Sequence, residues 1–209
     1  MEEYKYREFI YVVENTLCPY SDRESRIGPA WNDAVTFAEN IQSNAIELER
    51  FFNTFFQLQS HGYVMEVKSQ AVVTNLYQFA RLFYKILVAL SDVDPNKSNC
   101  LESTIDSVGW QYEFCGFRTF ITAFAPCYTK RHPRYSYSTE LSYLFFQPEK
   151  SFSFCGVNSK NRKAKELARQ RFKEAGRPYD GRLIDRRVEA WLYILPDEIG
   201  DPPIEWWDS

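Results

Sequence analysis

Hydrophobic residues in the first half of the chain recur at intervals typical of helices. In residues 43–62 they predict a helix that ends at Gly62. Residues 69–95 form the strongest helical pattern, ended by the Asp94–Pro95 pair. The predicted faces are Ile46, Phe52, Phe55, Phe56 and Gln59 in the first helix, and Val73, Leu76, Tyr77, Ala80, Tyr84, Leu87 and Leu90 in the second. Aromatic stripes at this spacing usually belong to a core.

Alternating apolar and polar residues predict strands elsewhere. The candidate runs are residues 34–39, 63–67, 110–116, 118–125 and 140–148. A basic helix over 159–176, a loop over 177–181 and an amphipathic segment over 186–198 follow. Because strands and helices interleave, the sequence predicts a mixed α/β (α+β) fold, with a mixed sheet flanked by helices, as one domain over residues 1–209.

Composition narrows the class of protein. The chain has 209 residues, 44% hydrophobic and 17% aromatic, which suffice for one sizeable core. The net charge of −3 gives no support for a nucleic-acid or membrane partner recruited by overall charge. The acidic, aromatic N-terminus does not resemble a signal peptide, and five cysteines without a CxxC motif fit free thiols in a reducing compartment. We therefore expect a cytoplasmic protein.

Common catalytic motifs are missing from the sequence. It contains no P-loop, GxGxxG, HExxH or GxSxG motif. Only two histidines occur, so a triad or a histidine-rich metal site has little support. His61, beside the predicted helix end at Gly62, is expected to be a capping residue favoured by the helix dipole.

Residues 110–138 combine aromatic residues with a basic cluster. His132 lies between Arg131 and Arg134, in a turn that Pro133 keeps out of helical geometry, and the neighbouring cations disfavour its protonation. Two arginines so placed can clamp carboxylates or phosphates. The alternative is a solvated basic turn.

Cys18 stands before Pro19 in a turn-rich stretch rather than within an apolar run. A thiol in such a loop can ligate a metal or a heme iron once its surroundings favour the thiolate. The alternative is a free structural thiol.

Seven segments together resemble, in order, the successive motifs of the YqcI/YcgG family. They are LCPYS (17–21), VTFAE (35–39), FYKILVALSDVDP (83–95), WQYEFCGFRTFI (110–121), APCYTKRHPR (125–134), LFFQPEKSF (144–152) and EAWLYILPDE (189–198). The resemblance spans nearly the whole chain. Members with known activity are heme-dependent N-oxygenases, which use iron and dioxygen to oxidise nitrogen in guanidine- or aminoimidazole-type substrates.

The resemblance implies an N-hydroxylating heme monooxygenase. It would bind heme b and dioxygen, take electrons from a reductase, and act on a small guanidino, amino or aminoazole substrate. Arg131 and Arg134 could hold the propionates, and the flat apolar walls would be Trp110, Phe114, Phe120 and Tyr135. Alternatives are a non-catalytic heme-binding or sensing protein and a small-molecule binding protein without heme.

The axial ligand is left open by departures from the family pattern. Where relatives carry Pro-x-His, this chain has Pro126, Cys127 and Tyr128, and their Arg-x-Ser-Arg becomes Arg-His-Pro-Arg over 131–134. Their Gln-Pro-Arg becomes Gln-Pro-Glu over 147–149. If the histidine of Pro-x-His is the iron ligand in relatives, Tyr128, Cys127 or His132 must replace it here, or heme is not bound. Cys18, which matches the family's early cysteine, ranks first as ligand because thiolate donation favours O–O cleavage, followed by His132 and Tyr128.

Overall fold

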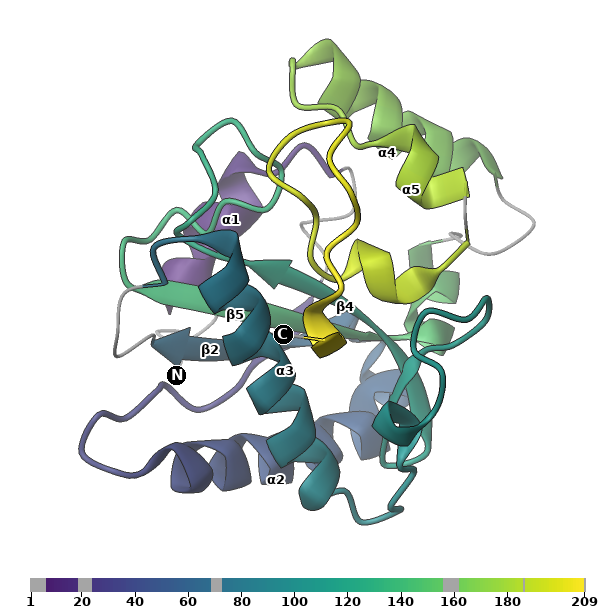
Figure 1. The fold of residues 1–209 in the computed structure, drawn as a ribbon. Coiled ribbons are helices and arrows are strands. Elements are labelled where there is room, and N and C mark those ends of the chain that lie inside the picture. Colours follow the sequence, from purple (N-terminus) through teal and green to yellow (C-terminus); the bar gives the residue numbers. More distant parts are fainter. Residues whose placement is uncertain (1–6, 19–23, 69–72, 156–161, 186, 209) are drawn as a thin grey trace.

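The protein is a single α+β domain built on one five-stranded mixed sheet (Figure 1). The computed structural model describes residues 7–18, 24–68, 73–155, 162–185 and 187–208. The strand order is β1-β2-β5-β4-β3. Strands β1 (Ser25–Ile27) and β2 (Gly62–Lys68) pair in parallel, whereas β5 (Leu141–Pro148), β4 (Phe117–Phe124) and β3 (Tyr112–Phe114) continue the sheet through antiparallel pairs. The predicted fold class is confirmed.

Helices α2 (Phe37–Leu58) and α3 (Leu76–Asp92) cover one face of the sheet (Figure 1). Phe51, Phe55, Phe83 and Leu87 from these helices are at most 1% exposed. Their apolar stripes pack on the inward side chains of the central strands and form the main core. The C-terminal turn η5 (Trp206–Asp208) closes this layer beside α3, since the Trp206 ring lies 5.0 Å from the Phe83 ring.

The opposite face carries shorter elements, among them α1 (Ile10–Asn15), α4 (Arg162–Glu174) and α5 (Gly181–Asp185) (Figure 1). The 3-10 turns on this side are η1 (Arg7–Phe9), η3 (Glu149–Cys155) and η4 (Glu189–Leu192), each of which contributes residues to the cavity lining. The turn η2 (Cys100–Glu102) precedes β3. These elements cover the sheet incompletely and leave a cavity between themselves and β4–β5.

Two sequence predictions about α2 are wrong. Residues 34–39 do not form a strand: Thr36 is the N-cap of α2, and Thr36 and Glu39 form a reciprocal capping box. These hydrogen bonds satisfy the free N–H groups of the first turn, so the helix begins earlier than the apolar spacing indicated. The helix also ends before Gly62, because Gln59 adopts the left-handed conformation.

The predicted faces of both helices are confirmed in part: Phe52 and Phe55 of α2, and Ala80, Leu87 and Leu90 of α3, are buried, but other predicted positions are not. In α2, Ile46 and Phe56 are 43% and 62% exposed, whereas Phe51 is buried. In α3, Tyr77 is 63% exposed and Phe79 is buried. Several faces of these helices are apolar, so the sequence alone did not distinguish the stripe that meets the sheet. Val73 precedes α3, which begins only at Leu76, after the Asn75 N-cap.

The other predicted elements are confirmed with shifted ends. The run 63–67 lies in β2, the three later runs contain β3, β4 and β5, and the basic helix is α4. The amphipathic segment 186–198 forms only the short turn η4 within the described residues. No helix in the described ranges is long and apolar enough to cross a membrane.

Candidate functional site

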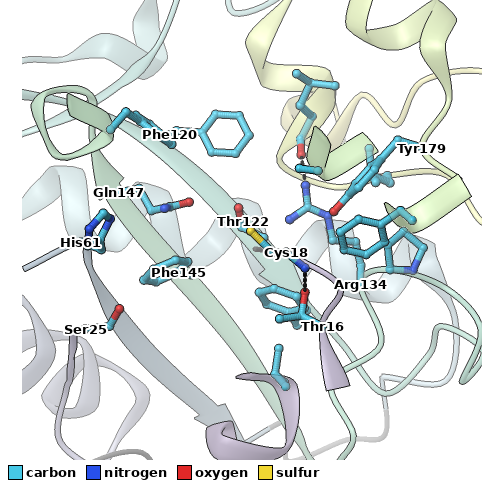
Figure 2. A pocket seen from close by; sticks show the side chains of 18 of the residues that line it. Thr16, Cys18, Ser25, His61, Phe120, Thr122, Arg134, Phe145, Gln147 and Tyr179 are labelled. Atoms are coloured by element: carbon cyan, nitrogen blue, oxygen red, sulfur yellow. Dashed lines mark hydrogen bonds between the residues drawn. The ribbon is translucent and has the colours of Figure 1, made fainter. Parts of the chain in front are cut away.

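A cavity of about 660 Å³ lies on the sheet face away from α2 and α3. Its floor consists of two cross-strand pairs of β4 and β5, Phe120 with Gln147 and Thr122 with Phe145. These side chains share one face because strand residues alternate between faces. In Figure 2 they line the sheet below a roof of helices. The volume falls within the range of small-molecule and cofactor sites, ~300–1,000 Å³.

Arg134 forms the cationic end of this cavity. Its side chain is 5% exposed and lines the cavity (Figure 2). One guanidinium nitrogen donates to the Leu192 carbonyl oxygen at 3.0 Å, but the buried Nε has no hydrogen-bond partner. The guanidinium carbon also lies 5.8 Å from the Phe124 ring centre and 5.9 Å from that of Tyr179. A buried cation with an unused donor and no carboxylate partner among the described residues is suited to an anionic ligand.

The turn that presents Arg134 is rigid. The Arg134 backbone N–H donates to His132 Nδ1 at 3.1 Å, and His132 Nε2 lies 3.1 Å from the Pro196 carbonyl oxygen. The proton must therefore sit on Nε2, and both ring nitrogens are occupied. The ring stacks on Tyr128 at 4.1 Å, and Arg177 donates to the carbonyl oxygens of Arg131 and His132.

The pKa of His132 is lowered from 6.5 to about 4, chiefly by burial and then by Arg134. This lowering of the pKa was predicted from the sequence but was attributed to the neighbouring charges alone. A ring whose two nitrogens are both hydrogen-bonded could ligate a metal only after breaking one of these bonds.

Cys18 lines the cavity between its two ends. In the view of Figure 2 it occupies the centre together with Thr122, between Phe120 and Arg134. Its backbone N–H donates to the Thr16 hydroxyl at 3.3 Å. This hydrogen bond links Cys18 to the loop after α1, and Cys18 is half-buried.

Glu189 forms the acidic end. It lines the cavity from η4, and its Oε2 accepts a hydrogen bond from Gln111 Nε2 at 2.8 Å. The Tyr193 hydroxyl lies 3.1 Å from Glu189 Oε1. Burial raises the pKa of Glu189 above its ordinary value, while these two hydrogen bonds oppose the rise. A carboxylate lies close to apolar walls here, although sequence reasoning did not single it out.

His61 is a second cavity residue that the sequence did not identify. It is 6% exposed and lines the cavity (Figure 2). Its ring lies edge-on to that of Phe154, with ring centres 5.8 Å apart. The prediction of a helix-capping role is wrong, because the cap of α2 is Gln59 and the His61 backbone N–H instead bonds to the Glu24 carbonyl oxygen. The end of α2 was predicted too late, at Gly62, and so His61 was not placed beside the start of β2.

The residues predicted to bind a cofactor fall into two groups. Phe120 and Arg134 line the cavity. Trp110 and Phe114 belong to the main core, where Trp110 donates to the Cys100 carbonyl oxygen at 2.9 Å and Phe114 packs against Phe52. Tyr135 packs on Tyr137 outside the cavity lining.

Arg131 is exposed and does not line the cavity. The structure thus separates the two predicted clamp arginines and leaves only Arg134 facing the cavity.

The three predicted iron ligands also differ in their position relative to the cavity. Cys18 lines the cavity, but His132 and Tyr128 do not. Tyr128 is 2% exposed, and its hydroxyl donates to the Leu195 carbonyl oxygen at 2.7 Å. Burial raises the pKa of Tyr128 well above its ordinary value, which disfavours the phenolate that a metal would need.

The other three described cysteines have raised pKa values. Burial raises the pKa of Cys127 to about 11 and that of Cys115 to about 12, and it also raises the pKa of Cys100. These thiols are free and half-buried, and they stay protonated at neutral pH. The side chain of Cys155 lies outside the described residues.

Comparison with known proteins supports the resemblance seen in the sequence. The sequence model of the YqcI/YcgG family matches residues 20–190, which include every strand of the sheet and most of the cavity lining. Searches of curated proteins and of solved structures gave no match. The match covers most of the sequence, so the chain belongs to the YqcI/YcgG family.

Proposed function

We propose that the protein is a heme-dependent N-oxygenase that binds heme b in the cavity over β4 and β5. The observation that carries this proposal is the joint presence, in one cavity, of a thiol at the centre and a buried guanidinium with an unused donor at one end. Resemblance to heme N-oxygenases suggested the activity. Within the described residues, the cavity offers a place where a macrocycle, dioxygen and a small substrate could meet.

The residues present fit a heme. A porphyrin is flat and apolar with two carboxylates on one edge, so a site for it would offer an iron ligand, aromatic walls and a cation. Cys18 can supply the donor, and Arg134 can bind a propionate through Nε at a position where no carboxylate of the described chain competes. Phe120 and Phe145 supply aromatic rings. The amide Gln147 on the same floor adds one polar group.

Each of these residues has a separate task. Arg134 binds an anionic edge and is held in place by the Leu192 carbonyl and the His132 ring. The phenylalanines of the floor and roof exclude water, which strengthens electrostatic interactions within the cavity. A bound heme supplies an iron centre at which dioxygen is activated with electrons from a separate donor. The free thiols of Cys100, Cys115 and Cys127 fit the cytoplasm, where we place this reaction.

The axial ligand provides the test. Heme-loaded wild-type protein, reduced and exposed to carbon monoxide, should show the red-shifted absorption band of a heme thiolate. In Cys18→Ser this band should vanish while the far-ultraviolet circular dichroism is unchanged, because Cys18 is only half-buried and contributes little packing. Cys127→Ser is the matched control and should keep the band.

Three outcomes would contradict the proposal, each at a different level. An unaltered spectrum in Cys18→Ser would remove this cysteine as ligand, and His132→Ala and Tyr128→Phe would then be measured. A protein that stays colourless after expression with added heme would leave a small-molecule site without heme. Iron held on both faces, with slow carbon monoxide binding and no spectral response to amines, would instead support a non-catalytic heme protein.

A further inference from the structure

We propose that Glu189 and Gln111 form the specificity site for the substrate, binding a cationic nitrogen group such as a guanidinium at the end of the cavity opposite Arg134. This inference rests on the proposed function for the role of the site, but the binding itself requires only the cavity. It predicts selection of cationic ligands over neutral ligands of the same shape.

The first observation is the carboxylate itself. Glu189 is half-buried, lines the cavity and has no ion-pair partner among the described residues. Its two oxygens are fixed by Gln111 at 2.8 Å and Tyr193 at 3.1 Å. The Tyr193 hydroxyl also lies 2.9 Å from the Thr119 carbonyl oxygen, so its single proton is shared between two acceptors. The carboxylate therefore keeps capacity to accept hydrogen bonds from a ligand.

The second observation is an unused acceptor beside this carboxylate. Gln111 Oε1 is buried and has no hydrogen-bond partner, although the same amide donates through Nε2 to Glu189. The amide cannot turn over without facing its oxygen toward the carboxylate, which would be repulsive. A buried acceptor without a donor costs free energy, and a ligand bearing N–H groups would remove this cost.

The third observation is the separation of Glu189 from Arg134 along the cavity, whose lining also includes Arg169. Tyr193, which contacts Glu189, packs on Phe120 at 5.5 Å between ring centres, whereas Arg134 lies over Phe124. Four residues of strand separate Phe120 from Phe124, a distance of about 13 Å at ~3.3 Å per residue. Arg134 itself is 95% buried with an unpartnered Nε, which independently indicates that this cavity receives a ligand.

This separation assigns different partners to the two ends. Anionic groups are attracted to Arg134 and cationic groups to Glu189, so an acidic cofactor and a basic substrate would not compete for one residue. Glu149 lines the cavity nearby and is exposed, and its charge adds to that of Glu189. Arg118 opposes it from outside the lining, where its guanidinium donates to the Gly109 carbonyl.

The experiment compares ligands of equal shape and different charge by isothermal titration calorimetry. L-Arginine and agmatine carry a guanidinium, whereas L-citrulline replaces it with a neutral urea. Wild-type protein, both heme-free and after heme loading, should bind arginine and agmatine at least ~10-fold more tightly than citrulline, because hydrogen bonds between charged groups are the stronger ones. Glu189→Gln should lower affinity for both cations by ~10–100-fold and leave citrulline unchanged.

A matched control is Glu102→Gln, which removes an exposed carboxylate in η2 that does not line the cavity. It should leave all three affinities unchanged. Equal binding of arginine and citrulline by the wild-type protein overturns the inference without requiring any variant to fold, as does the absence of any cation binding. If heme binds but the discrimination is missing, only this inference fails. If the discrimination is present in a protein that binds no heme, only the proposed oxygenase function fails.

Discussion

The two faces of the sheet differ in what covers them, although both are largely apolar. On the α2–α3 face, Ile121, Ala123, Leu144 and Phe146 are all 0% exposed and belong to one continuous core. On the other face the alternate residues of the same two strands border an open volume. Two long helices can fill the space above a sheet, whereas short turns and loops leave part of it empty.

This difference indicates where function can reside. The core face contributes stability because it excludes water and ligands alike. The cavity face contains the buried polar groups that the fold alone does not require, including a guanidinium with a free donor and an amide with a free acceptor. Buried polar groups without hydrogen-bond partners cost free energy, so we expect them at binding sites.

The largest expected effect comes from two neighbouring residues that point to opposite faces. Phe146→Ala should lower the free energy of unfolding by about 3–5 kcal/mol, because it opens a cavity in the main core. Phe145→Ala, on the cavity floor, should cost about 1–2 kcal/mol because its side chain already borders empty space. Urea denaturation of both variants measures the contrast. Equal losses would show that the two faces are equally packed.

His132 should make the stability of the cavity side depend on pH. Its pKa is about 4 in the fold and 6.5 when unperturbed, so folding favours the neutral ring. The stabilisation is complete above pH 6.5 and is lost as the pH falls toward 4. At ~1.4 kcal/mol per pKa unit the loss is on the order of 3 kcal/mol.

The free energy of unfolding of wild-type protein and His132→Gln, measured between pH 7 and pH 4, tests this expectation. The wild-type curve should fall more steeply, because Gln does not titrate. Parallel curves would mean that the fold does not lower the pKa of His132.

The fold was largely predictable because its signals are local. Strand alternation located β3, β4 and β5, and the basic composition located α4. The errors arose where two local signals competed: the capping box of Thr36 and Glu39 overrode the alternation in residues 34–39. Which stripe of α2 faces the sheet depends on tertiary packing, since Phe51 and Phe56 are equally apolar but only Phe51 is buried.

The site was predictable only in part, since it depends on contacts between distant segments. Cys18, Phe120 and Arg134 could be singled out from their local chemistry. Trp110 and Phe114 are aromatic like Phe120, but burial places them in the main core. Glu189 had no local signal, because its significance comes from Gln111, 78 positions away.

Two arginines three positions apart allow a sharper test of the cavity face. Arg134→Gln should weaken heme retention by ~10–100-fold, because it removes the charge that would bind a propionate. Arg131→Gln should change heme retention little, since Arg131 is exposed and lies outside the cavity lining. Heme dissociation measured by transfer to apomyoglobin distinguishes the two variants. Equal effects of the two substitutions on heme retention would indicate that the propionates contact the outer surface of the basic turn.

The smallest expected effect is a gain in stability on removing a charge from the cavity. Because the pKa of Glu189 is raised in the fold, chiefly by burial, the folded protein favours its protonated form. Gln111, Tyr193 and Arg118 oppose this rise and Glu149 adds to it. Below the unfolded pKa of 4.5, the buried carboxyl of Glu189 costs the protein no stability. The loss of stability develops as the pH rises through the folded pKa.

Glu189→Gln should therefore raise the thermal midpoint of ligand-free protein at pH 7, by about 2–4 °C for each 1 kcal/mol gained, and have no effect near pH 4. Scanning calorimetry of both proteins at the two pH values measures this, with Glu102→Gln as the control that shifts neither. Saturating agmatine should reverse the order at pH 7, because the cation stabilises only the carboxylate form. A variant less stable than wild-type protein at pH 7 without ligand would show that Glu189 serves the fold itself, through its bonds to Gln111 and Tyr193, rather than a ligand.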